Sequence, residues 1–184
     1  MVIALLMHIT LATPPASPIQ PGLLRAAAAE ATSIWSPYGV VIDVAAPSAG
    51  PADDAIVVVV DAVVTRQSGV PAAWQRALGA VSFDANGTPA PRITLFLTDL
   101  LAFVSSARMF GQPEWQWPRS LREKMIARVL GRVLAHEIGH FVLRTKRHAA
   151  AGLMRPLQFA DELVAPSRRT FALTNGDVLQ LAVR

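Results

Sequence analysis

The pentapeptide HEIGH at residues 136–140 is the feature that most restricts how this chain can fold. It lies near the end of residues 120–144, the longest stretch with a helical pattern. Residues four apart on an α-helix are separated by about 40° around the axis and by one turn along it. His136 and His140 therefore face the same way and can bind one metal ion. Glu137 lies about 100° around from His136, which places its carboxylate beside such an ion.

Only His, Asp and Glu side chains can complete this site, because the chain contains no cysteine. A catalytic zinc site has three protein ligands and one open position. His148 is one candidate for the third ligand, since a chain that turns back after the helix brings its ring to the ion. Asp161 and Glu162, about twenty residues beyond His140, are the alternatives, although a solvated face is the simpler interpretation of both.

Hydrophobic patterning predicts strands and helices in a characteristic order. Expected strands cover residues 2–10, 40–44, 56–64, 78–83 and 92–97, and expected helices cover residues 22–35, 120–144, 157–164 and 175–183. Residues 56–64 are almost entirely apolar, which is typical of a strand buried on both faces. The order predicts an α+β fold in which a mixed sheet packs against helices.

Other stretches carry more local signals. Residues 47–54 and 67–75 are expected to be loops, and residues 100–117 a short helix followed by a loop. Ser120 and Glu123 have the spacing of a capping box, which predicts that Ser120 caps the longest helix.

The first residues allow two interpretations. Residues 1–16 begin with an apolar run and end in Pro-Pro-Ala, which is compatible with a weak signal peptide and a secreted or periplasmic protein. However, no Lys or Arg precedes the run and no A-x-A cleavage site is evident. We therefore favour a strand, in which His8 has a structural role, and a signal-free chain would be cytoplasmic. No later apolar run reaches the roughly 20 residues of a membrane span, so we expect a soluble protein.

The charge is unevenly distributed. Residues 1–118 carry five Arg and eight acidic residues, whereas residues 119–184 carry twelve basic and five acidic residues, within a total net charge of +4. A basic half can face an anionic partner. None of the usual nucleic-acid-binding motifs occurs, so no nucleic-acid partner is expected and a solvated basic face is the simpler interpretation.

The residues after HEIGH extend the pattern. His148 is followed by Gly-Leu-Met at residues 152–154. This arrangement resembles the metzincin clan of zinc metallopeptidases, which have HExxHxxGxxH and then a tight turn with a methionine beneath the metal. The resemblance implies that Zn²⁺ is bound by His136, His140 and His148, that Glu137 is the general base, and that Met154 is the Met-turn residue. Without its context, Met154 would be interpreted as core filler.

The resemblance also implies a fold. It predicts one catalytic domain over residues 1–184, with an upper lobe over about residues 1–140 and a short C-terminal subdomain over about residues 141–184. The upper lobe would contain a twisted mixed five-stranded sheet, a backing helix and the active-site helix. The strand over residues 78–83 would be the edge strand that pairs with substrate, which brings Gly79, Ala80 and Val81 into contact with it.

Two departures from the family pattern affect the turn after the helix. Seven residues rather than five separate His140 from His148, and Leu143 stands where the family has the glycine that turns the chain out of the helix. We expect the helix to run about half a turn further, with the extra residues absorbing the difference.

These features predict a zinc-dependent endopeptidase that acts on peptides or proteins, with Glu137 removing a proton from a metal-activated water. One alternative is a catalytically inert, zinc-stabilised binding domain of the same fold, which would not need Glu137. Another is a nucleic-acid-binding protein with a chance HExxH. Asp99 and Asp161 are candidate acceptors for the second nitrogen of a metal-binding His ring.

Basic residues surround the expected cleft. A preference for acidic side chains in substrates is one hypothesis, and a solvated turn is the simpler interpretation. The residues concerned are Arg144, Lys146, Arg147 and Arg155.

Overall fold

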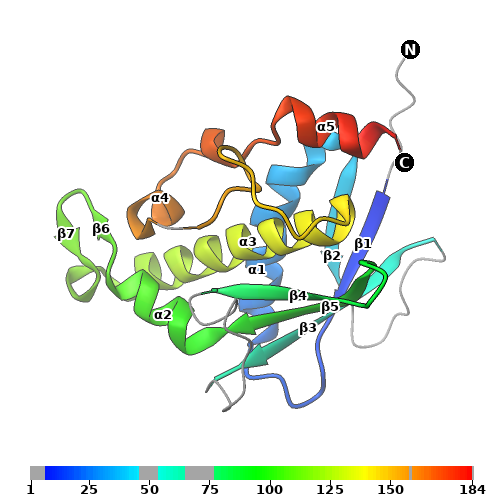
Figure 1. Cartoon of the computed structure of the whole chain (residues 1–184). Coiled ribbons are helices and arrows are strands. Elements are labelled where there is room, and N and C mark those ends of the chain that lie inside the picture. Colours follow the sequence, from blue (N-terminus) through cyan, green and yellow to red (C-terminus); the bar gives the residue numbers. More distant parts are fainter. Residues whose placement is uncertain (1–6, 46–53, 65–76, 158, 184) are drawn as a thin grey trace.

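A five-stranded mixed sheet forms the framework of the protein (Figure 1). The computed structural model describes residues 7–45, 54–64, 77–157 and 159–183. The strands occur in the order β2 (Val40–Val44), β1 (Met7–Ala12), β3 (Ile56–Val63), β5 (Pro89–Phe96) and β4 (Gly79–Phe83). The first four are parallel, and β4 pairs antiparallel with β5 at the end of the sheet. The predicted α+β class and mixed sheet are confirmed.

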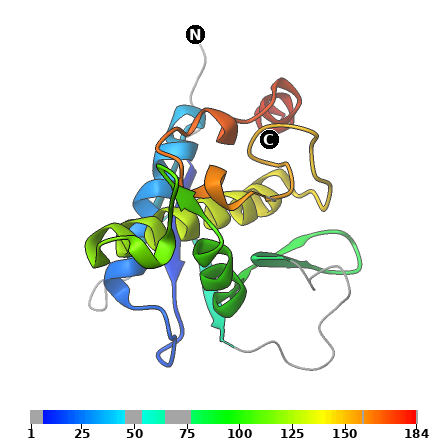
Figure 2. The same cartoon turned by 90° about the vertical axis from the view of Figure 1, so that its left-hand side faces the viewer.

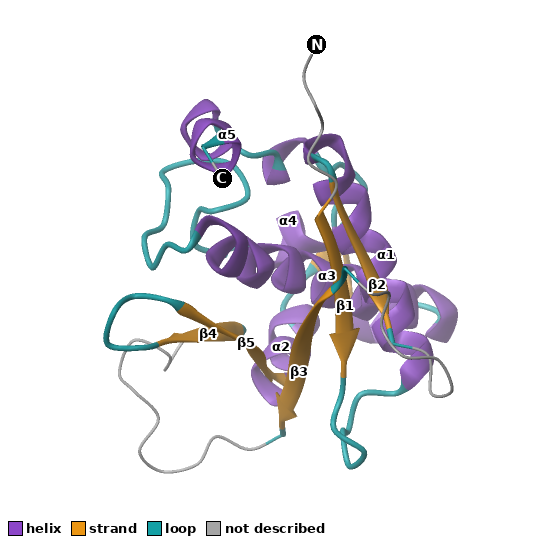
Figure 3. Cartoon of the chain, turned by 90° about the vertical axis from the view of Figure 1, so that its right-hand side faces the viewer, coloured by secondary structure: helices purple, strands orange, loops and turns teal. Residues whose placement is uncertain are grey.

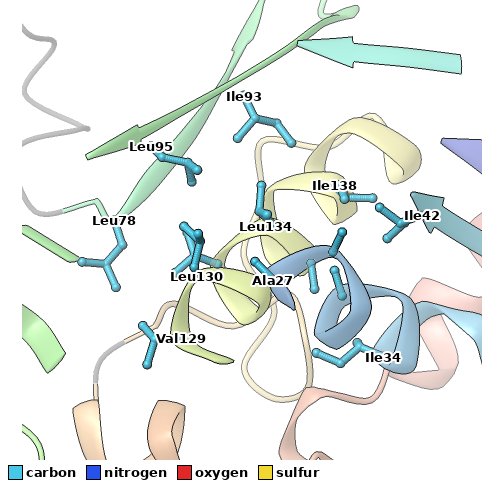
Figure 4. Packing of buried hydrophobic residues seen from close by; sticks show 14 of the residues in the cluster. Ala27, Ile34, Ile42, Leu78, Ile93, Leu95, Val129, Leu130, Leu134 and Ile138 are labelled. Atoms are coloured by element: carbon cyan, nitrogen blue, oxygen red, sulfur yellow. The ribbon is translucent and has the colours of Figure 1, made fainter. Parts of the chain in front are cut away.

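Two long helices, α1 (Pro21–Trp35) and α3 (Arg119–Leu143), pack against one face of this sheet (Figure 3). Alternate strand residues such as Leu95 and Ile42 meet Leu134 of α3 and Ala27 of α1 in a shared core (Figure 4). In β3, Val58 and Val60 are completely buried whereas Val57 is 38% exposed. The prediction that this strand is buried on both faces is therefore wrong, because these helices cover only one side of it.

The two helices approach each other closely at Gly131. A Cβ atom at this position would lie 2.5 Å from the backbone oxygen of Ala27 and 2.6 Å from Cβ of Glu30. Near the other end of the contact, the buried indole nitrogen of Trp35 donates a hydrogen bond to the Ala135 carbonyl oxygen at 2.9 Å. The Ala-rich composition of α1 thus serves packing as well as helix propensity.

The predicted capping box at the start of α3 is wrong. The helix begins at Arg119 with Pro118 at its N-cap and no side-chain cap, so Ser120 lies inside the first turn. The fixed φ of Pro118 prepares the start of the helix without a side-chain acceptor. Glu123 instead accepts a hydrogen bond from Arg119 at 2.8 Å, on the exposed surface.

The connection between β5 and α3 contains more regular structure than predicted. The expected short helix is α2 (Leu97–Ser105), which begins three residues earlier than expected. A small hairpin of β6 (Arg108–Met109) and β7 (Gln112–Pro113) and a 3-10 turn, Glu114–Gln116, follow it. Strands of two residues are too short to give an alternating pattern, so the sequence did not reveal them. The loops expected over residues 47–54 and 67–75 lie almost wholly outside the described residues, as do residues 2–6 of the expected first strand.

The chain after α3 folds back along that helix, on the side opposite β4 (Figure 1). It contains α4 (Ala160–Val164), a 3-10 turn, Arg169–Phe171, and α5 (Asn175–Ala182). The helices expected over residues 157–164 and 175–183 are therefore present in shorter form. In the described part of the chain, no helix is both long enough and apolar enough to cross a membrane.

A buried arginine of α3 holds the chain over residues 162–171 against the two long helices. Arg132 of α3 is 0% exposed, and its guanidinium lies 4.5 Å from the centroid of the Phe171 ring. It donates hydrogen bonds to a carboxylate oxygen of Glu30 at 3.1 Å and to the carbonyl oxygens of Glu162 at 2.7 Å and Ser167 at 2.9 Å. One side chain thus joins α1, α3 and the C-terminal segment.

Candidate metal centre

Three histidines converge at the C-terminal end of α3. His136 and His140 stand one turn apart on the helix and are buried, and the exposed His148 comes from the loop that follows. One ring nitrogen from each of the three lies within 4.8 Å of the others. This is the group expected from the sequence, and it can hold a metal ion.

The orientation of the two buried rings is set by backbone carbonyls. The Nδ1 atom of His136 donates to the Leu153 oxygen at 2.8 Å, and Nδ1 of His140 donates to the Thr145 oxygen at 2.7 Å. Because a carbonyl oxygen can only accept, each Nδ1 carries the proton and each Nε2 keeps a lone pair. The expected acceptors Asp99 and Asp161 do not fill this role. Every residue has a backbone carbonyl, so the sequence could not show which of them accept hydrogen bonds from the histidine rings.

The two lone pairs face each other. The Nε2 atoms of His136 and His140 are 3.1 Å apart, and with both protons on Nδ1 no hydrogen lies between them. Burial, assisted by the neighbouring His140, lowers the pKa of His136 to about 3, and burial also lowers the pKa values of His140 and His148. All three rings are therefore neutral at pH 7, which is the state that binds a cation.

A left-handed residue turns the chain from α3 toward His148. The helix ends at Leu143, and Arg144 has φ of 47°, a conformation that usually favours glycine. The Thr145 amide donates to the carbonyl oxygen of His140 at 3.2 Å and closes the turn. The turn falls one residue beyond the position of Leu143, a smaller shift than the expected half turn, and residues 145–147 lead on to His148.

Met154 packs against the segment that carries the histidines. It is 1% exposed, and a Cβ atom on Gly139 would lie 2.2 Å from its sulfur. The preceding Gly152 has φ of 76°, and the Leu153 amide donates to the Ala172 oxygen at 2.8 Å. Met154 thus belongs to the core and to a tight turn, and the same turn supplies the carbonyl that orients His136.

The Glu137 carboxylate lies between α3 and β4. The residue is 5% exposed, and burial raises its pKa to about 8. A Cβ atom on Gly79 would lie 2.9 Å from Cγ of Glu137 and 3.1 Å from its Oε1. The absence of a side chain at Gly79 therefore gives the carboxylate its space.

A cavity of about 700 Å³ connects these groups. The segment after α3 and the β4–β5 hairpin lie on opposite sides of the end of this helix (Figure 2). The lining combines Glu137 and the three histidines with Lys146, Pro156 and Leu157 from that segment and with residues of β4, including Gly79, Ala80 and Val81.

The other candidate ligands lie in different contacts. A carboxylate oxygen of Asp161 accepts a hydrogen bond from the Arg108 amide at 2.6 Å, and Glu162 forms an ion pair with Arg155. Neither belongs to the histidine group. His8 pairs with Asp43 at 2.8 Å between β1 and β2, so it has the structural role expected of it.

Comparison with known proteins adds no further identification. No protein-family model matches the chain, and a sequence search of curated proteins finds no match either. Functional inference therefore depends on the chemistry of the histidine group and its surroundings.

Proposed function

We propose that this protein is a zinc-dependent endopeptidase. The observation that carries the proposal is the pair of facing Nε2 lone pairs, 3.1 Å apart, with His148 alongside. Two nitrogens bound to one zinc ion in a tetrahedral arrangement, at about 2.0–2.1 Å, lie about 3.3 Å apart. Three neutral imidazoles suit Zn²⁺ better than Mg²⁺ or Ca²⁺, which prefer oxygen ligands.

The presence of Glu137 supports catalysis rather than a purely structural site. When bound, zinc would act as a Lewis acid that lowers the pKa of water and polarises a substrate carbonyl. Glu137 accepts the proton from the attacking water and delivers it to the leaving amine. Burial favours the protonated carboxyl, whereas a cation at the histidines favours the carboxylate, so Glu137 is suited to exchange a proton.

The neighbouring strand provides a place for substrate. β4 is the last strand of the sheet order, and Gly79, Ala80 and Val81 line the cavity beside Glu137. An extended peptide along β4 would continue the backbone ladder and bring a peptide bond past the carboxylate. The resemblance to metzincins supports this proposal, since it implies an edge strand that pairs with substrate together with a Met-turn.

The test combines metal content with hydrolysis. Purified protein is expected to contain one zinc ion per chain by mass spectrometry and to cleave internally quenched peptides of mixed sequence. Glu137→Gln should retain the zinc and lose at least about 100-fold in kcat/KM, because general acid–base catalysis contributes about 10²–10⁴-fold. Full zinc content without cleavage by the parent protein would instead favour the inert binding domain, and an active Glu137→Gln variant would refute the assigned role.

A further inference from the structure

We propose that the cleft selects substrates with an Asp or Glu side chain near the scissile bond, and that Lys146 recognises this carboxylate. The inference rests on the proposed peptidase function and adds a substrate class to it. Two observations support it, namely the position of Lys146 in the cleft and the charges of the residues that line the cavity.

Lys146 reaches across the cleft. It lies in the loop between His140 and His148, two residues before the latter, and lines the cavity. Its Nζ lies 5.2 Å from the centroid of the Phe83 ring, at the end of β4. A peptide lying along β4 would therefore pass the ammonium group close to the histidines.

Lys146 is the one lysine or arginine among the described residues that line this cavity, and Glu137 is the one acidic residue. The sequence suggested a basic rim of four residues. Arg155 is not available to a substrate, because it forms an ion pair with the Glu162 carboxylate of α4. Arg144 and Arg147 are exposed but do not line the cavity. The charge available to a substrate side chain is therefore concentrated at one position.

A carboxylate would be a better partner for this ammonium than its present one. The contact between Lys146 and Phe83 is a cation–π interaction, which is weak at an exposed site. A substrate carboxylate would form a charge-assisted hydrogen bond with the same ammonium. Glu137 is occupied with the reacting water in the proposed mechanism, so no other carboxylate of the lining competes.

Matched peptide pairs test the proposal. A single Glu is moved through each position of an otherwise uncharged quenched peptide, and each peptide is paired with its Gln counterpart. At the best position, the zinc-loaded parent should cleave the Glu peptide with a kcat/KM about two- to fivefold higher than the Gln peptide. Lys146→Met keeps the aliphatic stem and removes the charge, so the ratio should fall to about one.

Arg147→Met is the matched control, because it removes one positive charge from the same loop but outside the cavity lining, and it should keep the parent ratio. A ratio of one in the parent, or a preference that survives in Lys146→Met, would overturn the proposal.

Binding separates this inference from the peptidase proposal. Fluorescence anisotropy with labelled peptides and the Glu137→Gln variant requires no turnover. If no peptide is cleaved by the parent, the peptidase proposal fails. Tighter binding of Glu peptides that is lost with Lys146→Met would then still support acidic recognition, and equal binding of both peptides would refute it.

Discussion

A single proton on each buried histidine determines which ligand atoms the candidate metal centre offers. The Leu153 and Thr145 carbonyls hold that proton on Nδ1 of His136 and His140, so both Nε2 atoms point into the site as acceptors. The third histidine is different, because His148 is exposed and comes from a loop. A direct measurement of its contribution to metal binding therefore gives a sharp test of the candidate centre.

His148→Ala is expected to weaken zinc binding by more than about 100-fold, because outer-shell changes alone cost 10–100-fold and this change removes a ligand. A competition titration with a chromophoric chelator measures the affinity. Asp161→Asn and Glu162→Gln serve as controls and should bind zinc like the parent. Parent-like affinity in His148→Ala would exclude this residue as a ligand.

At the scale of elements, the crossing of α1 and α3 depends on glycine. Gly131→Ala would gain up to about 1 kcal/mol of helix propensity. The added Cβ would, however, lie 2.5 Å from the Ala27 oxygen, which is backbone and cannot rotate away. We expect a net loss of about 1–3 kcal/mol in the free energy of unfolding, measured by urea denaturation. Gly22→Ala in the same pair of helices is the control, because its Cβ would have no neighbour within 4 Å. Equal stability of the two variants would argue against the close crossing.

At the scale of the whole molecule, a buried charge cluster connects distant parts of the chain. Arg132 and Arg168 both donate hydrogen bonds to Glu30 of α1, across more than 100 residues of sequence. Burial on its own would raise the pKa of the Glu30 carboxyl, but the hydrogen bonds from Arg168 and Arg132 outweigh it and hold this pKa below its ordinary value. Ionised Glu30 therefore stabilises the fold.

Glu30→Gln should lower the free energy of unfolding by about 3 kcal/mol at pH 7, because Arg132 loses its buried counter-charge. The pKa of Glu30 is lower in the folded than in the unfolded state, so its contribution to stability is complete above the ordinary carboxyl pKa of 4.5 and is lost as the pH falls through the folded pKa. Urea unfolding of both proteins across this range should show the difference shrinking in acid. A difference that does not change with pH would contradict the assignment.

The sequence predicted the elements that carry their own signals. The β-branched run at residues 40–44 became a strand with the expected bounds, and α3 differs from its predicted range by one residue at each end. The histidine group followed from helical spacing together with the resemblance. Burial of a side chain by a segment distant in the sequence could not be predicted from local patterns. A charged side chain such as that of Arg132 carries no sequence signal of burial, yet residues 162–171 fold back and bury it.

The hydrogen bond from His136 to the Leu153 carbonyl couples the candidate metal centre to the chain that follows α3. The carbonyls that orient His136 and His140 belong to the chain after α3. Binding of a metal ion to these rings would therefore be thermodynamically linked to order in residues 144–157. Chelation should therefore speed tryptic cleavage at Arg144, Lys146 and Arg147 relative to cleavage at Arg25, the one Lys or Arg of α1, as followed by mass spectrometry. Identical digestion rates with and without chelator would show that the loop holds its shape unaided, and a difference would make protease resistance a simple reporter of metal loading.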